Sequence, residues 1–266
     1  LLWSCRLVSA VKVAVIGAAG RMGKQTSVAV AEAVDLELVA EVDRDGSVDD
    51  AAASGAQVVV DFTRPDVVMA NVERALALGM HAVVGTSGFD EDRLEQVRVL
   101  VDRTPGLGVV VAPNFALGAV LLMRFAREAA VHFASVEIVE THHPDKVDAP
   151  SGTAVHTAQL IAAARSAAAA PTAPDATSSA LPGARGATVD GIPVHSVRVR
   201  GAVAHEEVVF GNAGEILTLR HDSLDRAGFM PGVLLAVRQV GRRPGLTVGL
   251  EPLLGLAPEV VLLGTG

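Results

Sequence analysis

The first half of the chain alternates short apolar runs with longer stretches of helical pattern. Residues 11–16 are almost all apolar, which is typical of a parallel strand buried on both faces. Similar runs follow at residues 36–42, 58–62, 82–84 and 109–111. Because strands and helices alternate, we predict an α/β fold, a Rossmann-type doubly wound parallel sheet.

Turn residues indicate where the helices of this half begin and end. One helix is expected to run from the glycines at residues 17–23 to about Val34. Pro65 suits the start of another helix, which Gly79 then stops. A further helix is expected over residues 90–101.

The pattern changes after Pro113, and the remainder predicts a second, α+β unit. Three strand-like runs with little helix between them are expected to pair with their sequence neighbours as antiparallel strands. The elements expected in this part are helices at 118–130 and 151–170, strands at 136–140, 195–200, 206–210 and 216–221, and a surface loop at 171–186. A last helix at 232–240 and a strand at 246–248 are expected to return to the first unit.

The chain is therefore predicted to form two domains, the first of which is discontinuous. We place a dinucleotide-binding domain at residues 1–116 and 226–266 and the second domain at residues 117–225. The first assignment depends on a glycine-rich turn that follows the first strand, because such turns bind pyrophosphates.

Composition restricts the possible functions. Hydrophobic residues make up 50% of the chain and charged residues 20%, with a mean hydropathy of +0.41, so general disorder is excluded. Lys and Arg number 22 against 30 Asp and Glu, and the net charge of -8 argues against nucleic-acid binding. The single cysteine, Cys5, excludes a disulfide framework and a multi-cysteine metal site, which fits a reducing cytoplasm.

Apolar segments do not indicate a membrane protein. The chain has no uninterrupted apolar run of roughly 18 residues, so we expect no spanning helix. Residues 1–8 are mostly apolar, but no basic segment precedes the apolar run, and we do not expect a signal peptide. Trp3 and Cys5 lie in this segment and are given no chemical role.

The glycine-rich turn is Gly17-Ala18-Ala19-Gly20-Arg21-Met22-Gly23. Its glycines allow backbone N–H groups to approach a pyrophosphate at a helix N-terminus. Asp43 ends the second strand, where a ribose-binding carboxylate is expected. Asp43 suits the free 2′-hydroxyl of NAD and Arg44 suits the 2′-phosphate of NADP, so use of both cofactors is predicted. The alternative is an ordinary helix-start turn followed by a surface aspartate.

Three more loops follow strands of the same sheet. They are Asp61-Phe62-Thr63, Gly85-Thr86-Ser87 and Ala112-Pro113-Asn114-Phe115. Because the carboxyl ends of parallel strands share one edge, we expect these loops to border the nucleotide. Arg21 either contacts a phosphate or is solvated, and the sequence leaves both open.

Seven of the eight histidines lie in the second predicted domain. The densest segment is Glu140-Thr141-His142-His143-Pro144-Asp145-Lys146-Val147-Asp148-Ala149-Pro150-Ser151-Gly152-Thr153-Ala154. Adjacent histidines on an extended chain point to opposite sides, so no metal site is predicted. Lys146 and the helix start at Gly152 and Thr153, with Ser151 as N-cap, suit a substrate carboxylate. Histidine exchanges protons near neutral pH; the alternative is a polar loop with a capped helix.

Together these motifs resemble one family. The string His-His-x-x-Lys-x-Asp-Ala-Pro-Ser-Gly-Thr, the glycine-rich turn and the segment from Ala112 to Phe115 are similar to those of the 4-hydroxy-tetrahydrodipicolinate reductase (dihydrodipicolinate reductase) family. The resemblance extends from about Val11 to Leu254. Ser87 departs from the family, which commonly has a second threonine there, but the hydroxyl is kept.

The resemblance implies roles for particular residues. His142 is implied to be the proton donor and acceptor, and Lys146 a second proton donor. The residues implied to bind the substrate are His143, Gly152 and Thr153. The positions implied to bind the cofactor are Gly17, Ala18, Ala19, Gly20, Arg21, Met22, Asp43, Gly85, Thr86, Ser87, Ala112, Pro113, Asn114 and Phe115.

The resemblance also implies a reaction and an assembly. NADH or NADPH is implied to reduce 4-hydroxy-tetrahydrodipicolinate (dihydrodipicolinate), with hydride to ring C4 and a proton from His142 or Lys146, giving tetrahydrodipicolinate for diaminopimelate and lysine biosynthesis. Residues 117–225 are then a substrate-binding and tetramerisation domain of a cytoplasmic homotetramer. Two alternatives stay open: another two-domain NAD(P)-dependent dehydrogenase of a small carboxylated substrate, and a non-catalytic dinucleotide sensor.

Overall fold

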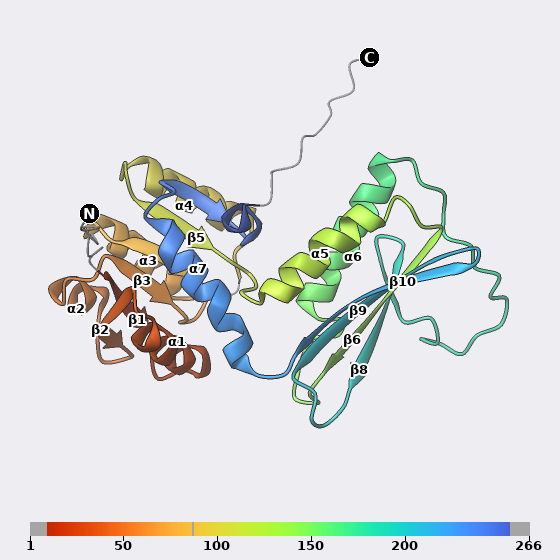
Figure 1. Ribbon diagram of the computed structural model, residues 1–266, viewed down its shortest axis with the longest axis horizontal. Coiled ribbons are helices and arrows are strands. Elements are labelled where there is room, and N and C mark those ends of the chain that lie inside the picture. Colours follow the sequence, from red (N-terminus) through yellow and green to blue (C-terminus); the bar gives the residue numbers. More distant parts are fainter. Residues whose placement is uncertain (1–9, 87, 256–266) are drawn as a thin grey trace, which may run out of the picture. The chain divides into compact units, whose positions relative to one another are not determined.

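The structure, a computed structural model, describes residues 10–86 and 88–255 and divides into two compact units (Figure 1). Unit 1 contains the described chain up to Phe115 and again from Phe229, and unit 2 is Ala116–Gly228. From the sequence we placed these boundaries at 116/117 and 225/226. The roles assigned to the two domains stay predictions.

Unit 1 is built on a six-stranded parallel sheet, which confirms the predicted Rossmann-type architecture. Its strands are β1 (Val11–Ile16), β2 (Leu36–Val42), β3 (Val58–Asp61), β4 (His81–Val84), β5 (Gly108–Val111) and β11 (Gly245–Val248). They lie in the order β11-β5-β4-β3-β1-β2, so the strand order reverses between β1 and β3. Ligands of such sheets bind outside the carboxyl ends of the strands, at this reversal.

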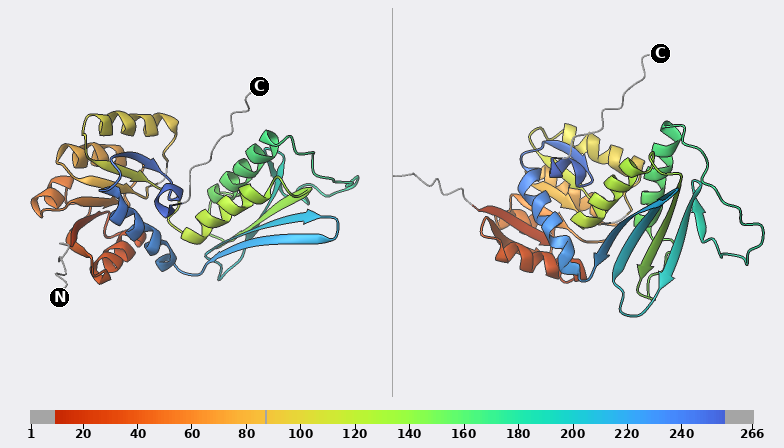
Figure 2. Two further views of the ribbon diagram at one scale, coloured as in Figure 1. Left: turned by 45° about the horizontal axis from the view of Figure 1, so that its top comes forward. Right: turned by 45° about the vertical axis from the view of Figure 1, so that its right-hand side comes forward.

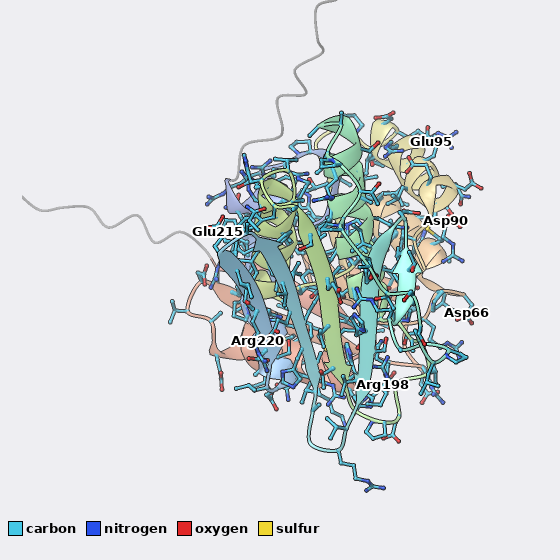
Figure 3. All side chains as sticks on the ribbon, turned by 90° about the vertical axis from the view of Figure 1, so that its right-hand side faces the viewer. Asp66, Asp90, Glu95, Arg198, Glu215 and Arg220 are labelled. Atoms are coloured by element: carbon cyan, nitrogen blue, oxygen red, sulfur yellow. The ribbon has the colours of Figure 1, made fainter. Side chains whose placement is uncertain are left out.

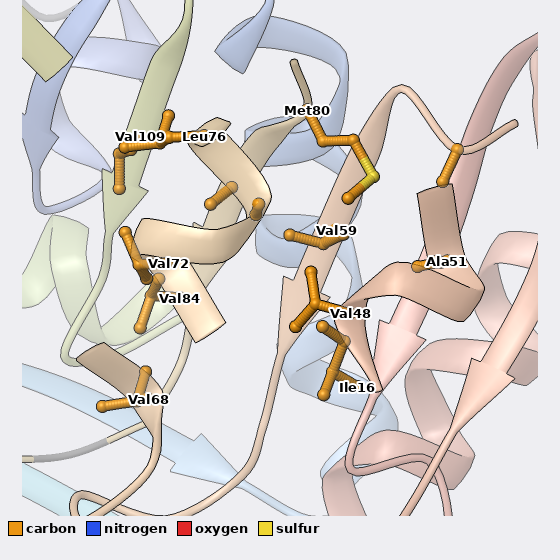
Figure 4. Close-up of a cluster of buried hydrophobic side chains, with 14 of the residues drawn as sticks. Ile16, Val48, Ala51, Val59, Val68, Val72, Leu76, Met80, Val84 and Val109 are labelled. Atoms are coloured by element: carbon orange, nitrogen blue, oxygen red, sulfur yellow. The ribbon is translucent and has the colours of Figure 1, made fainter. Parts of the chain in front are cut away.

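Helices cover the sheet of unit 1 on both faces (Figure 2). The helices are α1 (Arg21–Glu32), α2 (Val48–Ala53), α3 (Val68–Ala77), α4 (Glu91–Asp102) and α7 (Met230–Val240), with a short η2 (Glu251–Leu254) after β11. α1 packs against α7, whereas α2, α3 and α4 form a separate row. Figure 4 shows the apolar cluster beneath that row, in which Val48 and Val72 pack with Ile16 and Val59. Val60, beside Val59, is buried as well, because the sheet has no solvent face.

The helix after β3 begins later than predicted. Pro65 lies in a turn in which the N–H groups of Val67 and Val68 both donate to the Arg64 carbonyl (3.1 Å each), and α3 begins at Val68. Pro65 takes the second position of that turn, for which its fixed φ is equally suited. Gly79 follows the end of the helix in the left-handed conformation (φ 80°), as expected of a helix-stopping glycine.

Unit 2 is a mixed five-stranded sheet with two long helices on one face (Figure 1), which confirms the predicted second α+β unit. Its elements are α5 (Leu117–Ala129), β6 (Ser135–His142), α6 (Gly152–Ala167), β7 (Ala187–Val189), β8 (Ile192–Arg198), β9 (Ala204–Asn212) and β10 (Glu215–Ser223), followed by η1 (Arg226–Phe229). Figure 3 views the sheet from the face that α5 and α6 leave open, on which Arg220 of β10 is exposed.

The predicted pairing of the strands now labelled β8 and β9 is wrong. The sheet order is β10-β9-β6-β8-β7, so β6 lies between them, parallel to β8 and antiparallel to β9. The reason is α6, which carries the chain from β6 to β8, and a helical crossover of this kind joins parallel strands. β9 and β10 are antiparallel neighbours, as predicted.

Candidate active site

The glycine-rich turn folds against the end of β2. Gly17 has a left-handed φ of 81°, and the N–H groups of Gly17 and Ala18 donate to the Val42 carbonyl (2.8 and 3.2 Å). A Cβ on Gly23 would lie 2.1 Å from the Gly17 carbonyl oxygen, so this position requires glycine. Gly20 is the N-cap of α1 and has no side chain to cap the first N–H groups. The turn therefore presents a helix N-terminus suited to an anion.

Asp43 and Arg44 lie beside this turn. They directly follow Val42, whose carbonyl holds Gly17, and both residues are exposed. The Asp43 carbonyl accepts the Gly46 N–H (2.9 Å), which closes a turn at this point. A carboxylate and a guanidinium thus stand next to each other at the edge of the glycine-rich turn, where a ribose is expected.

Asp61 connects the loops that follow β3 and β4. The residue is 1% exposed, and its carboxylate accepts the N–H (2.9 Å) and hydroxyl (2.6 Å) of Thr63 and the Asn71 amide (2.8 Å). The Thr86 hydroxyl also donates to it (3.0 Å), so Thr86 has a structural bond besides its predicted cofactor role. Ser87, predicted to bind the cofactor, lies outside the described residues.

Two aromatic rings crowd Gly85. Phe62 and Phe115 pack edge to face with ring centroids 5.8 Å apart. A Cβ on Gly85 would lie 2.1 Å from the Phe62 ring and 2.8 Å from the Phe115 ring. Phe115 and Ala112 are buried, whereas Pro113 is exposed. The side chains of Phe115 and Ala112 therefore belong to the core, and a ligand at this edge would meet their backbone.

In unit 2, β6 reaches His142, two residues beyond the predicted strand end. Nδ1 of His142 lies 2.6 Å from Oε2 of Glu140, which is two positions earlier and therefore on the same face of the strand. Burial lowers the pKa of His142 below its ordinary value and outweighs the opposing effect of the Glu140 carboxylate. The imidazole is thus partly buried, held in place beside Glu140, and shifted towards its neutral form.

Glu140 is held by groups from two other segments, β8 and the start of α6. It is 0% exposed, and the Arg198 guanidinium donates to both of its oxygens (2.8 Å each). The Ser151 N–H also donates to Oε1 (3.2 Å). Burial acts to raise the pKa of Glu140, but hydrogen bonds from Arg198, Ser196 and His142 prevail and lower it. The carboxylate is therefore charged although it is buried.

Our sequence analysis did not identify Glu140 or Arg198 as site residues. A signal for Glu140 exists, because strand alternation places it on the inward face with Val136 and Ile138. No such signal exists for Arg198, which is 58 residues away along the chain and meets Glu140 only through the pairing of β6 with β8.

Lys146 and the start of α6 hold a carboxylate, that of Asp148. Lys146 Nζ lies 2.7 Å from Asp148 Oδ1, and the Gly152 N–H donates to Oδ2 (3.3 Å). Lys146 holds the pKa of Asp148 below its ordinary value. Ser151 caps α6 by accepting the Ala154 N–H (3.2 Å), as predicted. The ammonium and the helix N-terminus thus converge on one anionic group.

His143 and Thr153 flank this cluster, and both are partly exposed. The His143 carbonyl accepts the Lys146 N–H (3.2 Å), and the Thr153 carbonyl accepts the Thr157 hydroxyl (3.0 Å). Among the residues that the structure describes, no three His, Cys, Asp or Glu side chains are placed to hold a metal ion. No helix in the same ranges is long and apolar enough to cross a membrane.

The predicted site residues therefore form two groups. In unit 1, the glycine-rich turn, Asp43 and the loops after β4 and β5 share the carboxyl edge of the parallel sheet. In unit 2, His142, Lys146 and Gly152 lie around the end of β6 and the start of α6. Within each group all predicted residues belong to the same unit, and Ser87 alone lies outside the described residues.

The sequence matches a known family over both units. The N-terminal part of that family, described as "Dihydrodipicolinate reductase, N-terminus", matches residues 11–115, and the C-terminal part matches residues 118–254. The 4-hydroxy-tetrahydrodipicolinate reductase of Beutenbergia cavernae is 62% identical over 246 residues, which are 92% of this chain and 99% of that protein. The reductase of Nocardia farcinica is 58% identical over 246 residues, again 92% and 99% of the two chains.

Solved structures also match most of the chain. Dipicolinate-bound dihydrodipicolinate reductase from Paenisporosarcina sp. TG-14 has a TM-score of 0.81 and 37% identity, and the match covers 91% of this chain and 99% of that chain. GenD2 from gentamicin A biosynthesis, in complex with NAD, has a TM-score of 0.58 and 15% identity over 90% of this chain and 89% of that chain. At that identity the second likeness shows the fold alone.

Proposed function

This chain belongs to the dihydrodipicolinate reductase family, and from that premise we propose that it reduces the substrate ring at C4 while His142 protonates the neighbouring carbon. The chain is an NAD(P)H-dependent oxidoreductase of diaminopimelate and lysine biosynthesis and uses NADH or NADPH. A bound nicotinamide supplies the hydride that C4 accepts. The ring that accepts the hydride is dihydrodipicolinate, which the 4-hydroxy form becomes by loss of water, and the product is tetrahydrodipicolinate.

The observation that carries this proposal is the carboxylate held by Lys146 and the Gly152 N–H. In the structure that carboxylate belongs to Asp148, which stands in for a carboxylate of the substrate. The Paenisporosarcina relative is bound to dipicolinate, a dicarboxylate. We expect one substrate carboxylate to displace Asp148 from these donors, with His143 and Thr153 bordering the same ligand.

Proton transfer follows from the bond between His142 and Glu140. Because Nδ1 of His142 is engaged by Glu140 (2.6 Å), Nε2 is the nitrogen that exchanges a proton with the substrate. When hydride adds at C4, the electron pair of the enamine carbon takes the proton from Nε2. The imidazole is left neutral, with its Nδ1–H still donated to Glu140. Lys146 is the second candidate donor, because its ammonium lies beside the carboxylate position.

The residues of unit 1 fit a dinucleotide. Gly20 leaves the N-terminus of α1 uncapped, and the contact between Gly23 and the Gly17 carbonyl holds the turn tight, so that a pyrophosphate can approach the backbone. Asp43 would bind the ribose hydroxyls of NADH, and Arg44 would bind the 2′-phosphate of NADPH. The exposed position of both residues is compatible with this dual use.

Unit 2 also carries the surface through which we expect copies of the chain to assemble into a homotetramer. The face of its sheet opposite α5 and α6 exposes Ile216 (74%) and Val197 (41%). His205 of β9 and Arg220 and Asp222 of β10 form a linked polar group in the same sheet. An apolar surface of this kind is stabilised when a second copy covers it. The reducing cytoplasm is the compartment that suits the single cysteine.

The proposal is tested by following the loss of NADPH or NADH absorbance with the purified chain. Substrate is generated in situ by condensing pyruvate with aspartate semialdehyde. We expect rapid oxidation that depends on both components. Cofactor binding without oxidation would instead favour the dinucleotide sensor, and oxidation with a different carboxylated substrate would favour another dehydrogenase.

A further inference from the structure

A charged, fully buried carboxylate lies next to the proposed proton donor. Oε2 of Glu140 lies 2.6 Å from Nδ1 of His142, and the Arg198 guanidinium donates to both carboxylate oxygens at 2.8 Å each. The Ser151 N–H approaches Oε1 at 3.2 Å. With both oxygens occupied by donors, the carboxylate has one orientation, and the imidazole that donates to it has one as well.

The same ion pair is connected to the anion-binding segment. Nη2 of Arg198 also donates to the Asp148 carbonyl (2.8 Å), and Ser151 precedes the first residue of α6. The Glu140–Arg198 pair therefore joins the end of β6, the loop that carries Lys146, and the helix N-terminus at Gly152. Movement of this pair would displace the proton donor and the carboxylate-binding groups together.

Stability of the fold alone does not account for such a pair. A buried ion pair loses the hydration of both charges, and apolar residues of similar volume are often as stabilising. The residues that precede Glu140 on the same face of β6, Val136 and Ile138, are apolar and buried. The Glu140–Arg198 ion pair is better explained by the groups that it contacts, which are the His142 imidazole and the Asp148 carbonyl.

We infer that Glu140, held by Arg198, is the positioning residue of His142: it fixes the ring orientation and the Nδ1–H tautomer, so that Nε2 carries the transferred proton. The inference rests on the proposed role of His142 in proton transfer. Glu140 does not touch the substrate and acts only through the imidazole.

The charges around His142 predict how its titration responds. Glu140 favours the protonated ring, whereas the positive charges of Lys146 and Arg198 disfavour it. On β9, Ala204 lies opposite His142 and Glu206 lies opposite Glu140. Removal of the Glu140 charge therefore leaves two cations near the imidazole and shifts its protonation to lower pH.

Glu206 provides a matched control on the same face of the sheet. It is buried and forms a hydrogen bond with Thr157. Burial, with the nearby Glu140 charge, raises the pKa of Glu206 to about 7, so below pH 7 this side chain is mostly the neutral acid. Glu206→Gln keeps a neutral side chain of the same size, whereas Glu140→Gln removes a charge.

The test compares the pH profiles of kcat in the wild type, Glu140→Gln and Glu206→Gln. For Glu140→Gln we expect kcat to fall by roughly 10²-fold and KM to change little. The part of the pH profile in which kcat follows the protonation of His142 should move to lower pH. For Glu206→Gln we expect the wild-type profile below pH 7. An unchanged kcat and pH profile in Glu140→Gln, with His142→Gln inactive, would overturn the positioning role and leave the proposed function intact.

A measurement on the wild-type enzyme does not depend on whether Glu140→Gln folds. Nitrogen chemical shifts of the histidine rings, assigned with His142→Gln, report which ring nitrogen carries the proton. We expect the Nδ1–H tautomer for the neutral His142 ring. The Nε2–H tautomer would overturn the inference. Full activity of His142→Gln would instead remove the proposed proton transfer on which the inference rests.

Discussion

The Asp148 carboxylate lies 2.7 Å from the Lys146 ammonium, and its other oxygen accepts the Gly152 N–H. The loop thus supplies its own anion to the groups that are proposed to bind a substrate carboxylate. Substrate binding then has to replace one carboxylate by another. Asp148 is half exposed, so this replacement does not require a buried charge to be uncovered.

Asp148→Asn tests this replacement directly. The amide carries no charge and competes less well for Lys146, so we expect tighter binding of dipicolinate. Because an exposed ion pair contributes up to about 1 kcal/mol, the Kd for dipicolinate should fall by about 2- to 5-fold. Calorimetric titration measures it. Asp145→Asn, an exposed neighbour in the same loop, is the control and should bind as the wild type does. Weaker binding by Asp148→Asn would mean that Asp148 supports the ligand rather than competing with it.

His142→Gln should lower kcat by roughly 10²- to 10⁴-fold, the usual contribution of a positioned acid. Cofactor affinity should stay the same, because the residues proposed to bind the cofactor are all in unit 1. Steady-state kinetics and fluorescence titration with NADPH separate the two effects. His156→Gln, on the exposed side of α6, is the control. If kcat were unaffected by loss of His142, the proton would have to come from Lys146 or from water.

Arg44→Ala should weaken NADPH binding more than NADH binding. A charge-assisted bond to the 2′-phosphate is lost, and we expect roughly a 10-fold increase in the Kd for NADPH. Titration with each cofactor gives the ratio of the two effects. Arg98→Ala, which breaks an ion pair on α4 in the same unit, is the control for loss of a surface charge. Equal weakening of both cofactors would exclude a specific contact between Arg44 and the 2′-phosphate.

Glu206 should make stability fall as pH rises. Burial raises its pKa from 4.5 to about 7 in the folded chain, so the folded state prefers the protonated acid. Its contribution is complete below the unfolded pKa and is lost as pH rises from about 4.5 through about 7, by roughly 3 kcal/mol in total. Glu206→Gln should remove that loss, whereas Glu215→Gln on β10, which is exposed, should not. Urea unfolding from pH 4.5 to 8 measures the free energy of unfolding at each pH. The same dependence of that free energy on pH in the wild type and in Glu206→Gln would contradict the prediction.

The sheet of unit 1 was predictable because local signals specify it. Each of its first five strands is a mainly apolar run that is followed by a turn and a helical pattern. Glycines such as Gly17 and Gly79 mark the ends of elements. Pro65 was misassigned because the first turn of a helix and the second position of a β-turn require the same φ. Sequence alone does not distinguish these two uses.

In unit 2 the decisive relationships are not local. The expectation that successive strands pair failed at β8 and β9, because α6 allows β8 to join β6 in parallel. For the same reason Arg198 could not be matched to Glu140, although the two residues form an ion pair beside His142. The Lys146 and Gly152 segment was identifiable because its members lie within seven positions of one another.

The path of hydride and proton is the most direct test of the proposed reaction. The enzyme is supplied in ordinary water with NADPH that carries deuterium at the transferred position, and the product is examined by NMR. We predict one deuterium at ring C4 and a hydrogen from solvent at the neighbouring carbon. Deuterium at any other ring position, or oxidation of NADPH without deuterium in the product, would contradict the proposed mechanism.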